Sequence, residues 1–295
     1  MMDLTILGSA ASTPTPERSL PAIAVRVDGD ILLLDCGEGT QRQMMRLGVS
    51  YAKVSAIFIS HLHLDHYLGI FGMLETLRLN GRTTQIPLFG PVGSSRVFAR
   101  CKLLDIHEIE PSAAALKKPL FILNGHEVHA FQVSHGAGEE SFGFSIREPD
   151  RRRFHEAKAH AAGLKGPMFT QIQKEGKLKV GAKTLKLDDL SYVQPGKKLV
   201  YSGDTIYCKS LIRAAEGADL LIHDSTFDET QRELAKERSH STAGDAARTA
   251  KEANVKQLLL FHIGGRFHDT APLLAEAKAI FPHVKVAEDG MKLTL

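Results

Sequence analysis

The stretch His61-Leu62-His63-Leu64-Asp65-His66 brings three imidazoles and one carboxylate into six residues. It follows the apolar run 57–60, which is typical of a buried strand, and it precedes residues 67–79, whose apolar side chains recur mainly at helical spacing. We therefore expect a loop clamped between a strand and a helix, which is a rigid support for metal ligands.

The polar residues of this loop should point in two directions. His61 and His63 project to the same side of an extended backbone, whereas Asp65 and His66 point elsewhere once the chain bends into the helix. Two directions imply two metal positions. Zinc binds imidazole and carboxylate groups, and a hydrolytic site keeps one coordination position open for water. A His-rich surface loop and scattered core histidines are the alternatives, but four ligand-type residues in six argue against both.

Length and composition favour a globular protein. The chain has 295 residues, 43% of them apolar, which is enough for one large domain or two fused halves. No apolar run approaches the roughly 18 residues of a membrane span, and residues 1–8 show no signal pattern, so we expect no membrane association and a cytoplasmic protein. The three cysteines are Cys36, Cys101 and Cys208. They have no CxxC spacing, which argues against disulfides and against a thiolate zinc site.

The positive charge is concentrated in one segment. The net charge of the chain is only +3, but residues 151–198 hold 12 Lys and Arg against 4 acidic residues. The segment is punctuated by Gly166-Pro167 and Pro195-Gly196, and we find no periodic apolar face in it. We expect a protruding basic arm that binds phosphates without reading base sequence. A disordered, solvated insertion is the alternative.

Two further candidates follow predicted strands in the first half. Asp35 comes directly after a strand and could orient a ligand imidazole through its free ring nitrogen, or it could hold the turn at residues 37–39. His135 lies just past an alternating apolar run, where a strand-end ligand would stand. From the residues alone, His126 and His129 compete with His135 for that role.

The apolar runs predict two strand-rich halves. Strands are expected at residues 4–7, 23–27, 31–34, 86–89, 121–133 and 142–146, then at 198–201, 220–222 and 258–261, with helices at 39–47, 97–104 and 242–252. Asp28-Gly29 predicts a hairpin turn. Two such halves imply a sandwich in which two sheets face one another between helical layers. Asp204 and His262 then lie at strand ends along one edge, although Asp204 alone is an ordinary turn residue.

The motif Asp35-Cys36-Gly37-Glu38-Gly39-Thr40-Gln41-Arg42-Gln43, together with residues 61–66, resembles the metallo-β-lactamase superfamily and, within it, RNase Z, the endonuclease that trims transfer-RNA 3′ ends. The resemblance spans nearly the whole chain. It implies an αβ/βα four-layer sandwich with two facing mixed sheets. Residues 1–295 would form a single domain with halves at about 1–149 and 199–295, and residues 150–198 would be an inserted substrate-binding arm.

The resemblance implies two zinc ions per chain, with Mn²⁺ or Mg²⁺ as possible substitutes. A His followed shortly by Ser-Phe-Gly-Phe, here residues 141–144, selects His135 in this family. The implied ligands are His61, His63 and His135 for one ion, Asp65, His66 and His262 for the other, and Asp204 as the bridge.

The resemblance also implies the catalytic roles. Asp65 would orient or deprotonate the attacking water, and His240 would protonate the leaving 3′ oxygen. The products would be a transfer RNA with a 3′-hydroxyl and a trailer with a 5′-phosphate. The family's His-Glu-Ala-Thr motif supplies a Glu that orients the acid, whereas this chain has Asp224, which is one methylene shorter, so the contact stays open.

Substrate contacts are implied in two places. In this family an arm with Gly-Pro motifs grips the transfer-RNA elbow, and the matching residues here are Arg151, Arg152, Arg153, Lys165, Gly166 and Pro167. After His262 the family often has serines, but this chain has Gly264-Gly265-Arg266-Phe267. Arg266 could contact a phosphate, and Phe267 could stack on a base or simply pack. The resemblance further implies a homodimer that acts on precursor transfer RNA.

Two rival functions remain. One is a small-molecule ester or sulfate hydrolase, or a general phosphodiesterase, of the same fold, because a fold does not determine a substrate. The basic arm argues against it, since a small ester needs no such protrusion. The other is a non-catalytic RNA-binding module, which would require the loss of a ligand, and all seven ligand residues are present.

Overall fold

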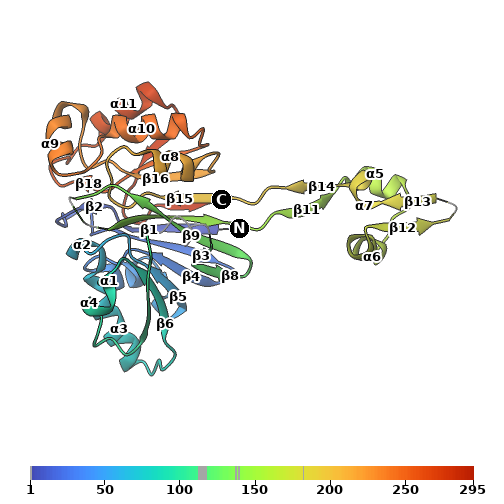
Figure 1. Cartoon of the computed structure of the whole chain (residues 1–295), viewed down its shortest axis with the longest axis horizontal. Helices are drawn as coiled ribbons and strands as arrows, with labels where there is room; N and C mark the ends of the chain where they lie inside the picture. The colour runs from blue at the N-terminus through green and yellow to red at the C-terminus, as the bar shows by residue number, and fades with distance from the viewer. Residues whose placement is uncertain (1, 112–117, 137, 139, 182) are drawn as a thin grey trace. The chain divides into compact units, whose positions relative to one another are not determined.

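The computed structural model describes residues 2–111, 118–136, 138, 140–181 and 183–295. The chain forms two compact units: Met1–Glu148 together with Lys197–Leu295, and Pro149–Gly196. Figure 1 labels many of the helices and strands in both units. Among the described residues, no helix combines the length and the apolar character that a membrane span requires.

The larger unit contains two sheets of seven strands each. In spatial order the first sheet is β20 (Lys292–Thr294), β1 (Met2–Gly8), β3 (Ala22–Val27), β4 (Asp30–Leu34), β5 (Val54–Phe58), β6 (Ile86–Gly90) and β7 (Leu104–Glu108). The second sheet is β19 (Val284–Val286), β17 (Leu258–Phe261), β16 (Leu220–Asp224), β15 (Lys198–Tyr201), β10 (Ser141–Arg147), β9 (His126–Val133) and β8 (Phe121–Leu123). Both sheets mix parallel and antiparallel pairs.

Helices cover the outer face of each sheet in this unit (Figure 1). Beside the first sheet are α1 (Thr40–Arg46), η1 (Tyr51–Lys53), α2 (Leu64–Tyr67), α3 (Gly69–Leu79) and α4 (Ser94–Val97). Beside the second are α8 (Lys209–Ala215), η3 (Glu229–Gln231), α9 (Arg232–Glu237), α10 (Ala243–Glu252) and α11 (Ala271–Ile280). A short parallel pair, β2 (Ala10–Ala11) and β18 (Ile263–Gly264), joins the two halves of the unit.

The alternation of side chains along β4 shows why the layers form. Leu32 and Leu34 are buried in the core between the two sheets, whereas Ile31 and Leu33 are buried in a separate cluster with α1 and α3. Because successive residues of a strand face opposite sides, a strand that is apolar at every position needs cover on both faces. The predicted four-layer αβ/βα sandwich is confirmed.

Most predicted elements are present, but two are wrong in detail. The helix expected at 97–104 is absent: α4 ends at Val97, residues 98–103 lie mainly in turns, and β7 begins at Leu104, where it pairs in parallel with β6. The strand expected at 121–133 is a hairpin, broken at Asn124-Gly125, where both residues have positive φ angles of 50° and 79°. Asn-Gly favours this tight turn.

The smaller unit has a fold and a core of its own. Its elements are β11 (Arg151–Phe154), α5 (Glu156–Ala161), α6 (Met168–Glu175), β12 (Lys177–Val180), β13 (Lys183–Lys186), α7 (Leu187–Leu190) and β14 (Ser191–Gln194). Side chains from its three helices, from β12 and from the loop before α6 gather in one cluster, which the lack of a periodic apolar face in the sequence did not indicate: Ala159, Leu164, Ile172, Leu178, Leu187 and Leu190. Its role as a substrate-binding arm stays a prediction.

Candidate metal centre

The segment 61–66 continues from β5, as expected. His63 has an extended backbone and precedes the first turn of α2, so the chain bends between His63 and His66. His61 and His66 are buried, and Asp65 is nearly so. His135 follows β9, Asp204 follows β15, and His262 follows β17 with a positive φ of 58°. The strands of both sheets therefore deliver these side chains to one edge of the sandwich.

Asp204 lies at the middle of the cluster. Its Oδ2 is 3.2 Å from His66 Nε2, 3.4 Å from His262 Nε2 and 3.7 Å from His61 Nε2. His135 Nε2 is 3.3 Å from His63 Nδ1. Possible ligand atoms lie within 4.8 Å of one another in sets that include His61 with His63 and His135, His61 with His66 and Asp204, and Asp65 with His66 and His262. All seven expected ligand residues therefore converge.

The hydrogen bonds of the imidazoles leave lone pairs facing this centre. Ser60 Oγ donates to Asp35, so His61 Nδ1, 3.0 Å away, must be the donor to Ser60. Thr226 Oγ1 donates to Asp224 in the same way, and His262 Nδ1 lies 2.9 Å from it. Each Nδ1 thus carries the ring proton, which leaves Nε2 as an acceptor or metal ligand.

The buried atoms at the centre support a cation site. Among the described residues, four of the six buried side-chain polar atoms without a hydrogen-bond partner face this centre: His61 Nε2, His66 Nε2, His262 Nε2 and Asp204 Oδ1. Leaving such groups unpaired is costly, and a divalent cation would satisfy all four. Burial lowers the pKa of His61 well below its ordinary value, so this ring is neutral as a ligand must be. For His66, burial is outweighed by the carboxylates of Asp204 and Asp35, which raise the pKa, so its Nε2 would give up a proton to bind a cation. The residues fit a metal site.

Asp35 holds the first-half imidazoles from behind. Its Oδ2 accepts from His66 Nδ1 at 2.8 Å and from the Tyr201 hydroxyl at 2.6 Å, and both of its oxygens accept from Ser60. The turn at 37–39 is instead held by Thr40 Oγ1, which donates to the Gly37 carbonyl. Of the two roles left open, the contacts favour orientation of an imidazole.

Asp224 reaches His240 despite its short side chain. Its Oδ2 lies 2.8 Å from His240 Nδ1, and Thr226 donates to its Oδ1 through both the backbone N–H and the hydroxyl. Burial of His240 opposes protonation, but the Asp224 carboxylate outweighs it and raises the pKa of His240 to about 9. The ring is therefore protonated at neutral pH, as a proton donor must be.

His135, and neither of its two competitors, lies at the centre. His135 Nδ1 lies 2.8 Å from the Ser239 carbonyl, to which it donates, so its Nε2 is the nitrogen that faces His63. His126 Nδ1 contacts the Asn124 carbonyl, and His129 pairs with Glu127 at 3.1 Å along β9. Neither competitor belongs to a possible metal group among the described residues.

A cavity of about 630 Å³ opens beside His63, His135 and His240. Arg266 lines it, with its guanidinium carbon 4.7 Å from the centre of the Phe227 ring, and its role as a phosphate contact stays a prediction. Phe267 is absent from the cavity lining and packs against the cluster beneath α10 and α11. The other expected substrate residues belong to the smaller unit, where Arg152 pairs with Asp188 and Arg153 donates to Gln194: Arg151, Arg152, Arg153, Lys165, Gly166 and Pro167.

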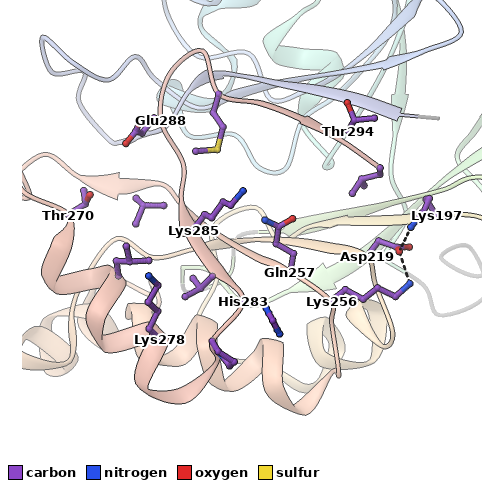
Figure 2. A pocket seen from close by; sticks show the side chains of 16 residues that line it. Lys197, Asp219, Lys256, Gln257, Thr270, Lys278, His283, Lys285, Glu288 and Thr294 are labelled. Atoms are coloured by element: carbon purple, nitrogen blue, oxygen red, sulfur yellow. Dashed lines mark hydrogen bonds and ion pairs between the residues drawn. The ribbon is translucent and has the colours of Figure 1, made fainter.

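A larger cavity of about 810 Å³ lies away from these ligands (Figure 2). Its lining includes residues that precede β15, β16, β17 and β19, and so lie at the strand ends opposite to those that carry Asp204 and His262. Asp219 there pairs with Lys197 at 3.0 Å and Lys256 at 2.8 Å. It forms no possible metal group among the described residues, so size alone does not locate the site.

Several positioning residues were missed from the sequence. Ser60, Tyr201, Thr226 and Ser239 each hold an imidazole or its supporting carboxylate. Tyr201 was the easiest of the four to predict from the sequence, because a tyrosine in a buried strand must find a partner for its hydroxyl. The others are common turn residues with no distinguishing pattern.

Comparisons with known proteins agree with this geometry. Two family models match: residues 2–92 match "Anti-Pycsar protein Apyc1", and residues 157–263 match "Beta-lactamase superfamily domain". Ribonuclease Z of Methanosarcina acetivorans is 38% identical over 100% of this chain and 98% of its own, and that of Myxococcus xanthus is 40% identical with the same coverage.

Solved structures show the same fold. Human tRNase Z, short form, is 28% identical with a TM-score of 0.69, covering 99% of this chain and 98% of its own. The metallo-β-lactamase fold protein YhfI from Bacillus subtilis has a TM-score of 0.73 at 21% identity, with the same coverage. With relatives this similar over its full length, the chain belongs to the ribonuclease Z family of metallo-β-lactamase-fold proteins.

Proposed function

We propose that this protein is a metal-dependent endoribonuclease that removes the 3′ trailer from precursor transfer RNA, leaving a 3′-hydroxyl on the transfer RNA and a 5′-phosphate on the trailer. The observation that carries the proposal is the central place of Asp204 among three imidazole nitrogens, with the Asp224–His240 pair beside it. Membership of the ribonuclease Z family supports the substrate.

The centre would hold two zinc ions, with Mn²⁺ or Mg²⁺ as substitutes. His61, His63 and His135 would bind one ion, Asp65, His66 and His262 the other, and Asp204 both. When bound, the ions polarise the scissile phosphate and lower the pKa of water. The lone pairs that already face the centre support this assignment.

The chain's own residues would move the protons. Burial of Asp65 favours its neutral form, but contacts with His262 and His66 outweigh this and lower its pKa, so Asp65 stays an ionised acceptor for the attacking water. His240 lines the cavity, is partly exposed to it and is held by Asp224. It would protonate the leaving 3′ oxygen.

The smaller unit, expected as the arm 150–198, would bind the body of the transfer RNA. Its basic residues supply phosphate contacts that need no base sequence, and its own core supports a defined surface. Arg266 would contact a phosphate near the cut. We also propose a homodimer, which is supported by four large apolar side chains exposed on α1, α2 and α3: Met45, Leu64, Phe71 and Leu79.

Cleavage of a 3′-extended precursor tests the function. The protein is incubated with this RNA and zinc, with and without a chelator, and both product ends are mapped. We expect one cut near the discriminator base, with a 3′-hydroxyl and a 5′-phosphate, and none with chelator. Hydrolysis of small esters without an endonucleolytic cut would replace the RNA proposal with that of a small-molecule hydrolase.

Removal of the smaller unit tests its role. Arg147 and Lys198 are register partners, and Glu148 donates a backbone hydrogen bond to Lys197 at 2.8 Å, so an Asn-Gly turn can join Glu148 to Lys197. We expect kcat/KM for precursor RNA to fall about 100-fold or more, while hydrolysis of bis(p-nitrophenyl) phosphate survives. Loss of both activities would make residues 149–196 part of the fold instead.

A further inference from the structure

The proline-rich loop 9–19 touches the proposed catalytic carboxylate. The backbone N–H of Ser12 donates to Asp65 Oδ2 at 3.0 Å. Ser12 has a φ of 59°, a conformation that side chains other than glycine rarely adopt. Ser12 and Thr13 also line the cavity beside His63 and His240. The loop therefore presents a strained backbone amide to Asp65, and other contacts must hold the loop in this position.

Asp289 anchors both ends of this loop. Its Oδ1 accepts from the hydroxyl of Ser9 at 2.9 Å, and its Oδ2 accepts from the backbone N–H of Ser19 at 2.7 Å. Between them, the N–H of Ala10 donates to the carbonyl of Ser19 at 2.9 Å and closes the loop. One carboxylate thus joins the residues where the loop leaves and re-enters the fold.

Two further contacts make Asp289 part of the buried framework. Gln43, the last residue of the 35–43 motif, donates to Asp289 Oδ2 at 2.9 Å and to the Leu7 carbonyl at 2.8 Å. Arg18 donates to Ser9 Oγ at 2.7 Å and to the Ala287 carbonyl at 2.5 Å. The anchor therefore joins α1, β1 and the segment after β19 to the loop.

The same loop touches the strand that follows another proposed ligand. The N–H of Ile263 donates to the carbonyl of Ser9 at 2.8 Å, and β2 pairs in parallel with β18, directly after His262. Asp65 and His262 are both expected to hold the second ion. A displaced loop would disturb both of these side chains at once.

We propose that Asp289 is a positioning residue, which holds the loop 9–19 so that the Ser12 amide orients the Asp65 carboxylate toward the attacking water. The proposal rests on the proposed function for the role of Asp65. Its contacts, however, involve only this chain, so it can be tested without RNA.

The test uses Asp289→Leu in the full-length protein. This change keeps the approximate size of the side chain but removes both acceptor oxygens, so Ser9, Ser19 and Gln43 lose their shared partner. We expect faster hydrogen–deuterium exchange in a peptide covering 9–19, weaker binding of the second zinc in a chelator competition, and a kcat for bis(p-nitrophenyl) phosphate about tenfold or more lower with KM nearly constant. The control is Glu17→Gln, which changes an exposed side chain of the same loop and should leave all three readouts unchanged.

A second variant separates positioning from general stability. Ser12→Val places a β-branched residue at a positive φ on an exposed position, so it should shift the amide without disturbing the core. If both changes break one interaction, the double variant should lose no more kcat than the worse single variant. Multiplied losses, or faster exchange without loss of kcat, or no change in any readout, would overturn the proposal. Failure of the wild type on precursor RNA with intact diester hydrolysis would instead overturn the proposed function.

Discussion

Two buried carboxylates, Asp35 and Asp224, form the same contact on opposite sides of the metal centre. Each lies 2.8 Å from an imidazole Nδ1, that of His66 and that of His240 respectively. The other nitrogen of His66 is fully buried and faces Asp204, whereas His240 lines the site cavity. One chemical arrangement thus prepares a metal ligand on one side and a proton donor on the other.

The two carboxylates differ in what else they hold together. Asp35 follows β4 of the first sheet and accepts from Tyr201, the last residue of β15 in the second sheet. Among the described residues, the donors to Asp224 all belong to the second half, and they include Thr205 and Thr226. Loss of Asp35 should therefore damage the sandwich and the metal site. Loss of Asp224 should leave the sandwich intact but damage the reaction and, through Thr226, the support of His262.

Asp35→Ala should have the largest effect. It removes a buried partner from His66, Ser60 and Tyr201, so the free energy of unfolding should fall by about 3–5 kcal/mol. Bound zinc should fall below one ion per chain, and RNA cleavage should be lost. Urea unfolding of the metal-free protein and elemental analysis measure these effects.

Asp3→Asn is the matched control for that change, because Asp3 forms an exposed ion pair with Arg26 at 2.9 Å. Its effect on stability should stay within about 0.5 kcal/mol. Full zinc content and near-native stability in Asp35→Ala would contradict the idea that Asp35 joins the two sheets.

Asp224→Ala should have the next largest effect, chiefly on the rate. Without the carboxylate, His240 loses the partner that orients and charges it, so kcat should fall by about 10²–10⁴. His240→Gln should have a similar effect, and the double variant should be little worse than either. His240→Gln should leave the zinc content unchanged. Asp224→Ala also removes the partner of the Thr226 hydroxyl that holds His262, so its binding of the second zinc should weaken. Full zinc content in Asp224→Ala would show that Thr226 holds His262 without this carboxylate.

The sequence predicted those metal ligands that lie close together in the chain. Residues 61–66 lie together, so their residue types alone indicated a metal site. Asp204 looks like any turn residue, and only the resemblance of the chain to a family indicated that it would bind both ions. Thr226 and Tyr201 were missed because their partners lie 36 and 166 residues away, and no periodicity marks a single hydroxyl.

The fold divides in the same way. Strands buried on both faces were recognised from apolar runs. The spacing at 97–104 suggested a helix where the chain instead forms turns between α4 and β7. The core of the smaller unit combines Ala159, Leu164 and Leu187 from separate short elements. Their spacing fits no single helix or strand, so the sequence indicated an arm outside the main core but did not reveal this cluster.

Asp224→Glu should have a smaller effect than removal of the carboxylate. Glutamate is the residue that the resemblance implies at this position, but here Asp224 is enclosed by Thr205, Thr226 and Ser241. An extra methylene in a filled site costs about 1–3 kcal/mol, so we expect kcat to fall about tenfold with zinc content unchanged. A kcat equal to or above that of the wild type would mean that the site relaxes to accept the longer side chain.

Tyr201→Phe should have the smallest effect, and it tests the link between the two sheets most directly. The change removes one of four donors to Asp35 and leaves His66 and Ser60 in place, so Asp35 is not left unpaired. The free energy of unfolding should fall by about 1–2 kcal/mol, since this hydrogen bond is to a charged group. Zinc content should be normal, and kcat should change less than about threefold, because His66 keeps its own contact with Asp35. A loss of zinc in Tyr201→Phe would show that the Tyr201 hydroxyl is needed to hold His66 toward the centre.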